Sequence, residues 1–247
     1  MKNIFKVLHL IRLKLIRLVL IDYLHKIYLK SLSGSLHNCE PNERVVEYGF
    51  VFKSLLNDNI KKVLDVGTGL TALPHVLDTC GFQVTAIDNI DDYWGHAMFN
   101  RHYHVINDNI LNTNMKETFD AITCVSVLEH IHDHHKAIEG MFSLLNPSGI
   151  IILTFPYNEN IYIDNVYKID GADWGDHVKY IAQVFSRNEI NQWLKNNDGE
   201  VIDQEYWKNY TGKYHVFGDS IYPPQKVTKD DLHQLTCIVI KKKDTNG

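Results

Sequence analysis

The segment from Val63 to Thr71 constrains the fold of this chain more than any other, because an apolar run passes through an acidic residue into two closely spaced glycines. Gly67 and Gly69 have no side chain, so the backbone here can turn sharply and lie directly against a ligand. A second apolar run, Phe82 to Ile87, leads into Asp88, twenty-one residues after Gly67. A carboxylate at that distance can accept hydrogen bonds from ribose hydroxyls. The pattern predicts an α/β protein that binds an adenosine-type cofactor.

Strand and helix signals alternate through the middle of the chain. Apolar runs predict strands at 61–66, 82–87, 103–107, 119–127 and 149–155, with helices at about 70–80, 91–100 and 133–145. Because crossover helices join parallel strands, this order predicts a doubly wound, mostly parallel sheet. A capping-box helix beginning at Ser186 and two strand-like runs, 200–207 and 235–241, follow.

The segment at about 157–185 interrupts this alternation with Tyr, Asn, Asp and Gly and no clean period. A long insertion between regular elements is more often a functional loop than idle chain. We therefore expect this segment to cover the substrate. It falls within a single predicted domain, residues 41–247, which a separate extension of residues 1–40 precedes.

Charge is distributed unevenly along the chain. Residues 1–30 contain seven Lys or Arg and one Asp, a net charge of +6, so the remainder carries −11 of the formal total of −5. Apolar residues at three- and four-residue spacing predict that the extension contains a basic amphipathic helix. Packing on the domain, dimerisation and contact with an anionic membrane surface are the alternatives for this helix. No apolar run in it approaches the roughly 20 residues that a membrane span requires.

The net charge and the cysteine content restrict the class of binding partner and the cellular compartment that we expect. The acidic body disfavours nucleic-acid binding, which needs a surface that neutralises phosphates. The four cysteines are scattered without a C-x-x-C pair, as in proteins of the reducing cytoplasm. We expect a cytoplasmic protein that acts on a small molecule, peripheral to the inner membrane if its basic N-terminus binds lipid.

Two classes of cofactor fit the glycine turn. Gly67-x-Gly69-x-x-Ala72 satisfies the dinucleotide fingerprint, with Asp88 at the expected distance, so an NAD(P)-dependent oxidoreductase is a competing prediction. Asp65, two residues before Gly67, favours a different ligand. A carboxylate there would repel a pyrophosphate, but it suits a cationic sulfonium compound with a free amino group.

Residues 61–157 resemble the class I S-adenosylmethionine (SAM)-dependent methyltransferases, because they contain several short motifs of that family in the same order. The motifs are Leu64 to Gly69, Ala86 to Asp88, Asn107 to Ile110, Phe119 to Ile122, Ser126 to His130 and Leu145 to Gly149. The resemblance implies a Rossmann-like sheet of seven strands, the last antiparallel and inserted beside its predecessor. It also implies S-adenosyl-L-methionine as the methyl donor and S-adenosyl-L-homocysteine (SAH) as the product.

The wider pattern is similar to methyltransferases of bacterial surface-polysaccharide and small-molecule pathways, and the richness in Ile, Lys and Asn fits a bacterial source. This similarity implies methyl transfer to an oxygen of a small molecule, with a nucleotide-activated or polysaccharide precursor as the preferred acceptor. A non-catalytic SAM-binding protein that keeps the fold is a further alternative.

The same resemblance assigns cofactor-binding roles at the strand ends. Gly67, Thr68 and Gly69 would lie against the methionine portion of the cofactor, with Asp65 near its amino group. The remaining expected cofactor-binding residues are Asp88 at the ribose hydroxyls, Asp108 or Asn109 at the adenine edge, Ser126 beside the sulfonium, and Asn89 and Glu129. Each carboxylate also has a structural alternative as a turn or loop residue.

Methyl transfer requires alignment of the acceptor and exclusion of water, and an oxygen acceptor benefits from a base. The candidate catalytic bases are His130, at a strand edge, and His177, in the irregular segment. Their alternatives are a structural hydrogen bond and a surface position, respectively. His130 and His134 could share a helix face, but no partner with metal-ligand spacing accompanies them, so no metal site is expected.

Overall fold

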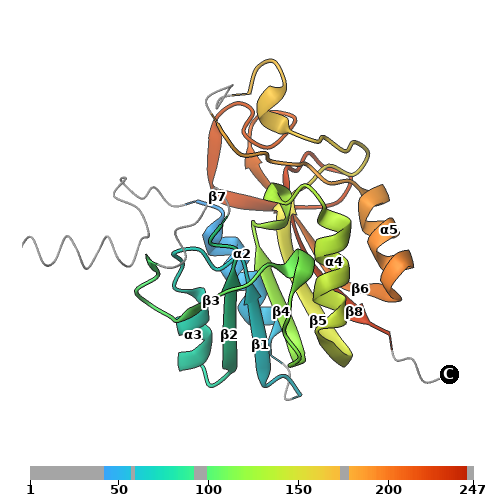
Figure 1. Cartoon of the computed structure of the whole chain (residues 1–247). Helices are drawn as coiled ribbons and strands as arrows, with labels where there is room; N and C mark the ends of the chain where they lie inside the picture. The colour runs from blue at the N-terminus through green and yellow to red at the C-terminus, as the bar shows by residue number, and fades with distance from the viewer. Residues whose placement is uncertain (1–41, 57–58, 92–98, 173–177, 244–247) are drawn as a thin grey trace, which may run out of the picture. The chain divides into compact units, whose positions relative to one another are not determined.

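The computed structural model describes residues 42–56, 59–91, 99–172 and 178–243 (Figure 1). The chain divides into two compact units, Met1–Glu40 and Pro41–Gly247, and the described residues all belong to the second. The predicted N-terminal amphipathic helix, most of the helix predicted at 91–100, and His177 lie outside the described residues. In the part of the chain that the structure describes, no helix is both long enough and apolar enough to cross a bilayer.

One sheet of eight strands runs through the described domain in the order β3-β2-β1-β4-β5-β8-β6-β7. The strands are β1 (Lys62–Val66), β2 (Gln83–Asp88), β3 (Val105–Asn107), β4 (Phe119–Val125), β5 (Leu145–Pro156), β6 (Gly199–Tyr210), β7 (Ser220–Val227) and β8 (Leu235–Lys242). Strands β1 to β5 pair in parallel. Strand β8 lies antiparallel between β5 and β6, and β7 pairs antiparallel with β6.

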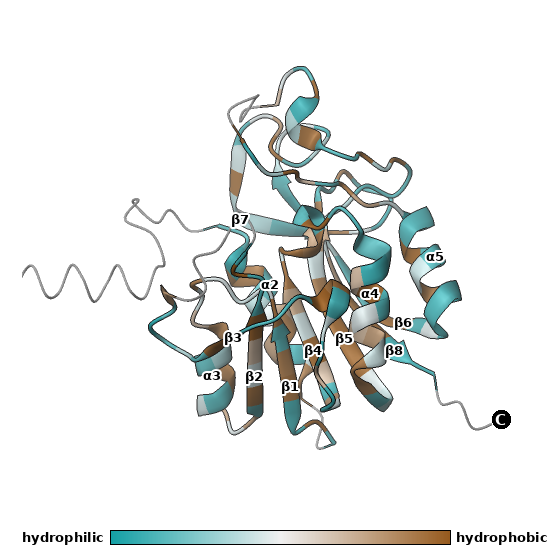
Figure 2. Cartoon of the chain, viewed as in Figure 1, coloured by the Kyte–Doolittle hydropathy of each residue, from teal (hydrophilic) through white to brown (hydrophobic). Residues whose placement is uncertain are grey.

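Helices cover both faces of this sheet. The helical elements are α2 (Arg44–Ser54), α3 (Leu73–Thr79), α4 (His134–Ser143) and α5 (Arg187–Asn197), with short 3-10 turns η2 (Ile110–Asn112), η3 (Leu128–His130) and η4 (Val166–Lys168). Alternating strand residues point to opposite faces, so Val63 packs with α2 and α3, whereas Leu64 packs with α4 and α5. Figure 2 shows hydrophobic residues concentrated along the central strands. Both faces of the central parallel strands β1, β4 and β5 are therefore buried, as in other doubly wound sheets.

The mostly parallel sheet and the antiparallel insertion of β8 confirm the predicted fold class, but there are eight strands rather than seven. The additional strand is β7, which contains Pro223 and Pro224 and is largely exposed. Because proline cannot donate a ladder hydrogen bond, it is tolerated in a sheet mainly on edge strands. Its presence also breaks the apolar pattern by which a strand is predicted from the sequence. The predicted capping box at Ser186 is present, because Glu189 accepts from the Ser186 backbone N–H.

A small third cluster of apolar residues forms at the carboxyl end of the parallel strands. It joins the irregular segment after β5 to the hairpin between β6 and β7, through Ile163, Val166, Tyr167, Ala182, Val184 and Val216. Figure 1 shows this yellow segment and the β6–β7 hairpin beyond the ends of β4 and β5. Two parts of the chain that are distant in sequence thus lie together over the sheet edge at which open α/β proteins bind ligands.

Two helical glycines provide a matched test of how closely α4 packs against η2. A Cβ added to Gly140 on α4 would lie 2.2 Å from the Ile110 carbonyl oxygen, whereas one added to Gly49 on α2 would meet nothing within 4 Å. We expect Gly140→Ala to lower the free energy of unfolding by about 2–3 kcal/mol through overpacking. Gly49→Ala should raise it by about 0.5–1 kcal/mol through helix propensity. Urea unfolding of both variants measures the difference, and equal effects would contradict this packing of α4 against η2.

Candidate functional site

The turn after β1 contains two glycines because the backbone has positive φ at both Gly67 and Gly69, and at Gly67 there is also no room for a side chain. Gly67 has φ +76°, and a Cβ there would lie 2.4 Å from Val127 Cγ1. Its backbone N–H donates to the Ile87 carbonyl at 2.9 Å, and the Gly69 N–H donates to Asp88 Oδ2 at 2.6 Å. The turn is therefore fixed against the end of β2. The structure brings the predicted glycines and Asp88 together at one edge of the sheet.

Asp65 lies beneath this turn with its carboxylate buried. Thr68 Oγ1 donates to Oδ2 at 2.7 Å and Thr123 Oγ1 donates to Oδ1 at 2.6 Å. Burial raises the pKa of Asp65 to about 6, although the two hydroxyls act to lower it. The carboxylate thus anchors Thr68 from below, and its predicted role at the cofactor amino group stays a prediction.

Glu47 on α2 is a buried carboxylate that the sequence analysis did not select. Ser126 Oγ and Thr154 Oγ1 donate to its Oε1 at 2.6 and 2.7 Å, and Arg44 Nη1 pairs with its Oε2 at 2.7 Å. These contacts tie α2 to the ends of β4 and β5. Glu47 shares a helix face with Phe50 and Val51, so a lone carboxylate on an apolar stripe was the signal that could have revealed it.

Ser126 adopts φ +48°, in the left-handed region that non-glycine residues rarely occupy. Its backbone N–H donates to the carbonyl and the hydroxyl of Thr154, both at 3.0 Å, while its side chain is held by Glu47. Such conformations persist where the surroundings over-determine them, and they cluster at functional sites. Ser126 lies directly after β4, where the family resemblance implies that the sulfonium binds, and this role stays a prediction.

Arg44 contributes a cation beside these carboxylates. Its side chain is 36% exposed, and Nη1 also approaches the Val125 carbonyl oxygen at 3.4 Å. Burial alone would lower the pKa of Arg44, but the charges of Glu47, Tyr48, Glu43 and Glu129 together outweigh this effect and raise that pKa. A guanidinium that stays charged at the end of β4 can pair with the carboxylate of an amino-acid ligand.

Glu129 and His130 occupy η3, directly after β4. Glu129 is 4% exposed, and among the described residues its Oε2 has no hydrogen-bond partner. Burial raises the pKa of Glu129 to about 8. His130 Nδ1 lies 2.6 Å from the Ile181 carbonyl oxygen, and its Nε2 lies 3.9 Å from Glu129 Oε1. Gln183 donates from its backbone N–H to the Glu129 carbonyl oxygen at 2.9 Å, which fastens the covering segment onto η3.

The residues predicted at the adenine edge take part in local turns. Asp108 accepts from the Asn109 N–H at 2.8 Å and from Thr113 Oγ1 at 2.6 Å. Asn109 caps η2 by accepting from the Leu111 N–H, and Asn89 accepts from the Asp91 N–H at 3.3 Å. The Asp108 N–H donates to the Asp88 carbonyl oxygen, so these turns adjoin the end of β2. Their contacts to adenine stay predictions.

The described parts of the chain contain no group of three or more His, Cys, Asp or Glu side chains that could hold a metal ion. His134, which the sequence analysis considered with His130 as a possible metal ligand, instead accepts a hydrogen bond from Trp193 Nε1 at 3.0 Å. Burial lowers the pKa of His134 to about 4, which keeps its ring neutral. Its role is to join α4 to α5.

Comparison with known proteins agrees with this geometry. A family described as methyltransferase domain matches residues 32–204. The ubiquinone biosynthesis O-methyltransferase of Coxiella burnetii strain RSA 493 is 32% identical over 158 residues, which are 58% of this chain and 65% of that protein. The Pseudomonas fluorescens Pf0-1 protein of the same name is 32% identical over 122 residues, 46% of this chain and 51% of that protein. The chain therefore matches under two thirds of the length of these curated relatives.

Solved structures share the fold at low sequence identity. Coclaurine N-methyltransferase, bound to N-methylheliamine and SAH, matches with a TM-score of 0.59 at 14% identity, covering 87% of this chain and 80% of that one. The N-methyltransferase NodS from Bradyrhizobium japonicum, in complex with SAH, matches with a TM-score of 0.52 at 16% identity, covering 83% and 89%. At this identity the likeness shows the fold alone.

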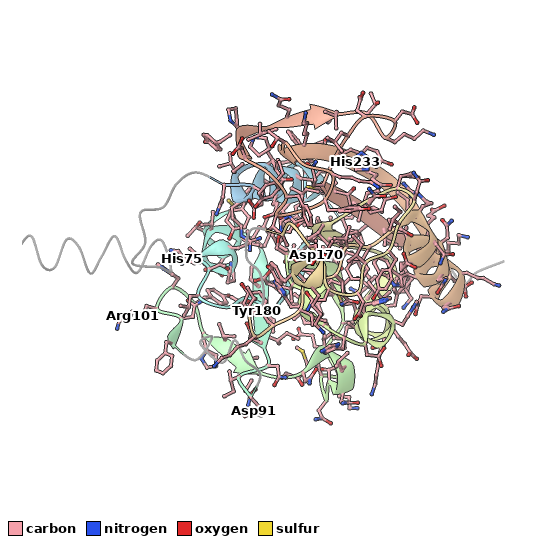
Figure 3. All side chains as sticks on the ribbon, turned by 90° about the horizontal axis from the view of Figure 1, so that it is seen from above. His75, Asp91, Arg101, Asp170, Tyr180 and His233 are labelled. Atoms are coloured by element: carbon pink, nitrogen blue, oxygen red, sulfur yellow. The ribbon has the colours of Figure 1, made fainter. Side chains whose placement is uncertain are left out.

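Asp88 provides a direct test of the ribose assignment. We expect Asp88→Ala to weaken SAH binding by about 1–3 kcal/mol, because a hydrogen-bonding carboxylate and the support of the Gly69 N–H are both lost. Asp88→Asn keeps one acceptor oxygen and should lose less. Asp91→Ala is the control, because Asp91 is exposed and lies toward the margin of the view in Figure 3. Isothermal titration that gives the same dissociation constant for all three variants and the native protein would remove Asp88 from the site.

The raised pKa of Glu129 predicts how stability changes with pH. In the folded state Glu129 keeps its proton up to about pH 8, whereas the ordinary pKa of a glutamate is 4.5. The contribution of Glu129 to the free energy of unfolding is therefore fully present below about pH 4.5. It is lost as the pH rises toward 8. Glu129→Gln cannot ionise. Relative to the native protein, this variant should therefore gain on the order of 3 kcal/mol between pH 5 and pH 8. Urea unfolding at both pH values measures this gain, and parallel pH profiles would contradict it.

Proposed function

This chain belongs to the methyltransferase-domain family and is a SAM-dependent methyltransferase, and we propose that it transfers the methyl group to an oxygen of a small molecule. The observation that carries the proposal is the fixed orientation of His130 at the end of β4. Its Nδ1 faces a backbone carbonyl, and its Nε2 is directed to the neighbourhood of Glu129.

The charges around the strand ends support a sulfonium cofactor. Asp65, Asp88 and Glu47 supply carboxylates, and Arg44 supplies a cation on the same edge of the sheet. When bound, SAM brings a sulfonium, an ammonium and a carboxylate together with an activated methyl group. The carboxylates favour its two positive groups and Arg44 favours its carboxylate, whereas a dinucleotide pyrophosphate would meet several like charges. The same distribution argues against the oxidoreductase alternative.

The tautomer of His130 follows from its partner. A carbonyl oxygen only accepts, so Nδ1 must carry the proton, which leaves a lone pair on Nε2 when the ring is neutral. In the proposed reaction, Nε2 would take the proton of an acceptor hydroxyl, while SAM held at the glycine turn would supply the methyl group to that oxygen and leave as SAH. A neutral amine already presents a lone pair and needs no such base at the moment of attack. The fixed base therefore favours an oxygen acceptor.

The names of the curated relatives also support oxygen as the atom that accepts the methyl group. The curated proteins that match at 32% identity are named O-methyltransferases of ubiquinone biosynthesis, and the two matches cover 58% and 46% of this chain. N-methyltransferases occur among the solved structures, but at 14–16% identity they inform the fold and not the acceptor. Two classes of acceptor should therefore be tested. The first is the nucleotide-activated or polysaccharide precursors that the sequence pattern favours, and the second is compounds of ubiquinone-type pathways. His177 stays a predicted second base.

His130 is tested by variants that separate catalysis from binding. We expect His130→Ala and His130→Gln to lower kcat about 10²- to 10³-fold, because a positioned base is lost, while SAH affinity changes little. Added imidazole should restore part of the activity of His130→Ala. His75→Ala is the control, because His75 is exposed on α3.

The assay follows methyl transfer to hydroxyl and amine acceptors by mass spectrometry. Methylation of nitrogen in preference to oxygen would refute the proposal, and so would native kcat in both His130 variants.

A further inference from the structure

Asn100, in the segment between β2 and β3, is a half-buried residue that bonds to the glycine turn. Its Nδ2 donates to the Gly69 carbonyl oxygen at 2.9 Å and to the Thr71 carbonyl oxygen at 3.0 Å. These partners precede Asn100 by 31 and 29 residues, so the contact exists only in the folded chain. One amide group therefore spans the turn at which the family resemblance implies that the cofactor binds.

The other end of the same amide fixes the segment that carries it. Asn100 Oδ1 accepts from the backbone N–H groups of His102 and Tyr103 at 2.8 and 3.1 Å. Carbonyl oxygens only accept and N–H groups only donate, so the four partners determine which way the amide is turned. The Tyr103 hydroxyl donates to the Val84 carbonyl oxygen on β2 at 2.8 Å, whereas Arg101 is directed outward at the margin of Figure 3. The segment is thus anchored on β2 with Asn100 against the turn.

Asn100 completes the restraint of Gly69, which is held at both of its backbone polar groups. The Gly69 N–H donates to Asp88 Oδ2, and its carbonyl oxygen accepts from Asn100. Gly69 has φ +55°, and a glycine has more backbone conformations available than any other residue. Because the peptide group is planar, a fixed Gly69 carbonyl also fixes the direction of the Leu70 N–H. Removing the Nδ2 donors would therefore release one side of the turn.

We propose that Asn100 is a positioning residue, which holds the glycine turn in the conformation that binds SAM and SAH. It acts through Gly69 and Thr71, the two residues whose carbonyl groups it fixes. Ordering a loop during binding costs free energy, so a turn that is already fixed in the free protein binds its ligand more tightly. The inference goes beyond the proposed function, because cofactor binding does not depend on which atom accepts the methyl group.

Two substitutions separate the two ends of the amide. Asn100→Asp keeps an acceptor for His102 and Tyr103 but places a carboxylate oxygen, which cannot donate, against two carbonyl oxygens. Asn100→Ala is uncharged and removes both ends. We expect each variant to raise the Kd of SAH by at least about fivefold in isothermal titration, because the two hydrogen bonds that fix the turn are lost. Asn112→Asp is the matched control, since Asn112 is exposed on η2 and an aspartate there keeps the acceptor for Lys136 Nζ.

Amide hydrogen exchange in the protein without ligand reports on the turn directly. We expect the Gly69 N–H, followed by NMR, to exchange at least about fivefold faster in both Asn100 variants than in the native protein. Its hydrogen bond to Asp88 should open more often once the carbonyl side of the turn is released. The amides of α5 are the internal control and should keep their native exchange rates, because a local release does not open the rest of the domain.

Several results would overturn the inference. Weaker binding confined to Asn100→Asp would assign the effect to the added charge, and weaker binding confined to Asn100→Ala would assign it to the local turn of residues 100–103. Native SAH affinity in both variants, or native exchange at Gly69, would show that the amide does not position the turn. Faster exchange throughout α5 would show a loss of global stability instead. A failure of the proposed function would appear in the methylation assay, whereas a failure of this inference appears in SAH binding and exchange.

Discussion

The buried carboxylate of Glu47 is the interaction on which the arrangement of the site depends. A charge removed from water must be satisfied by several donors, and here Ser126, Thr154 and Arg44 supply them. Because these donors come from the residue after β4, from β5 and from α2, one side chain fixes the helix to the sheet edge. It also holds Ser126 in a left-handed conformation that would otherwise be costly.

Charged side chains are unevenly distributed along the edge of the sheet at which the parallel strands end. Carboxylates lie beside and beneath the glycine turn, where Asp65 and Asp88 are bound by threonine hydroxyls and a backbone N–H. At η3, burial instead raises the pKa of Glu129 to about 8. The carboxylates of the first region suit a cationic cofactor. Burial raises the pKa of both Asp65 and Glu129, and two threonine hydroxyls act to lower that of Asp65.

Much of the fold could be predicted because it is encoded locally. Apolar runs, turn residues and the capping box at Ser186 each act over a few neighbours, and the order of elements then restricts the topology. Strand β7 could not be predicted in this way. Its eight residues include two prolines and few buried side chains, so pairing with β6, rather than its own pattern, makes it a strand.

The sequence by itself determined the glycine turn and the acidic residues at the ends of β1 and β2, because glycine conformation and strand alternation are properties of the local chain. Only the tertiary structure decided which side chains share the site with them. Glu47 precedes Ser126 by 79 residues, and Ile181 follows His130 by 51. Their juxtaposition, the tautomer of His130 and the raised pKa of Glu129 depend on burial and on partners from distant segments, and both exist only after the sheet, α2 and the covering segment have packed together.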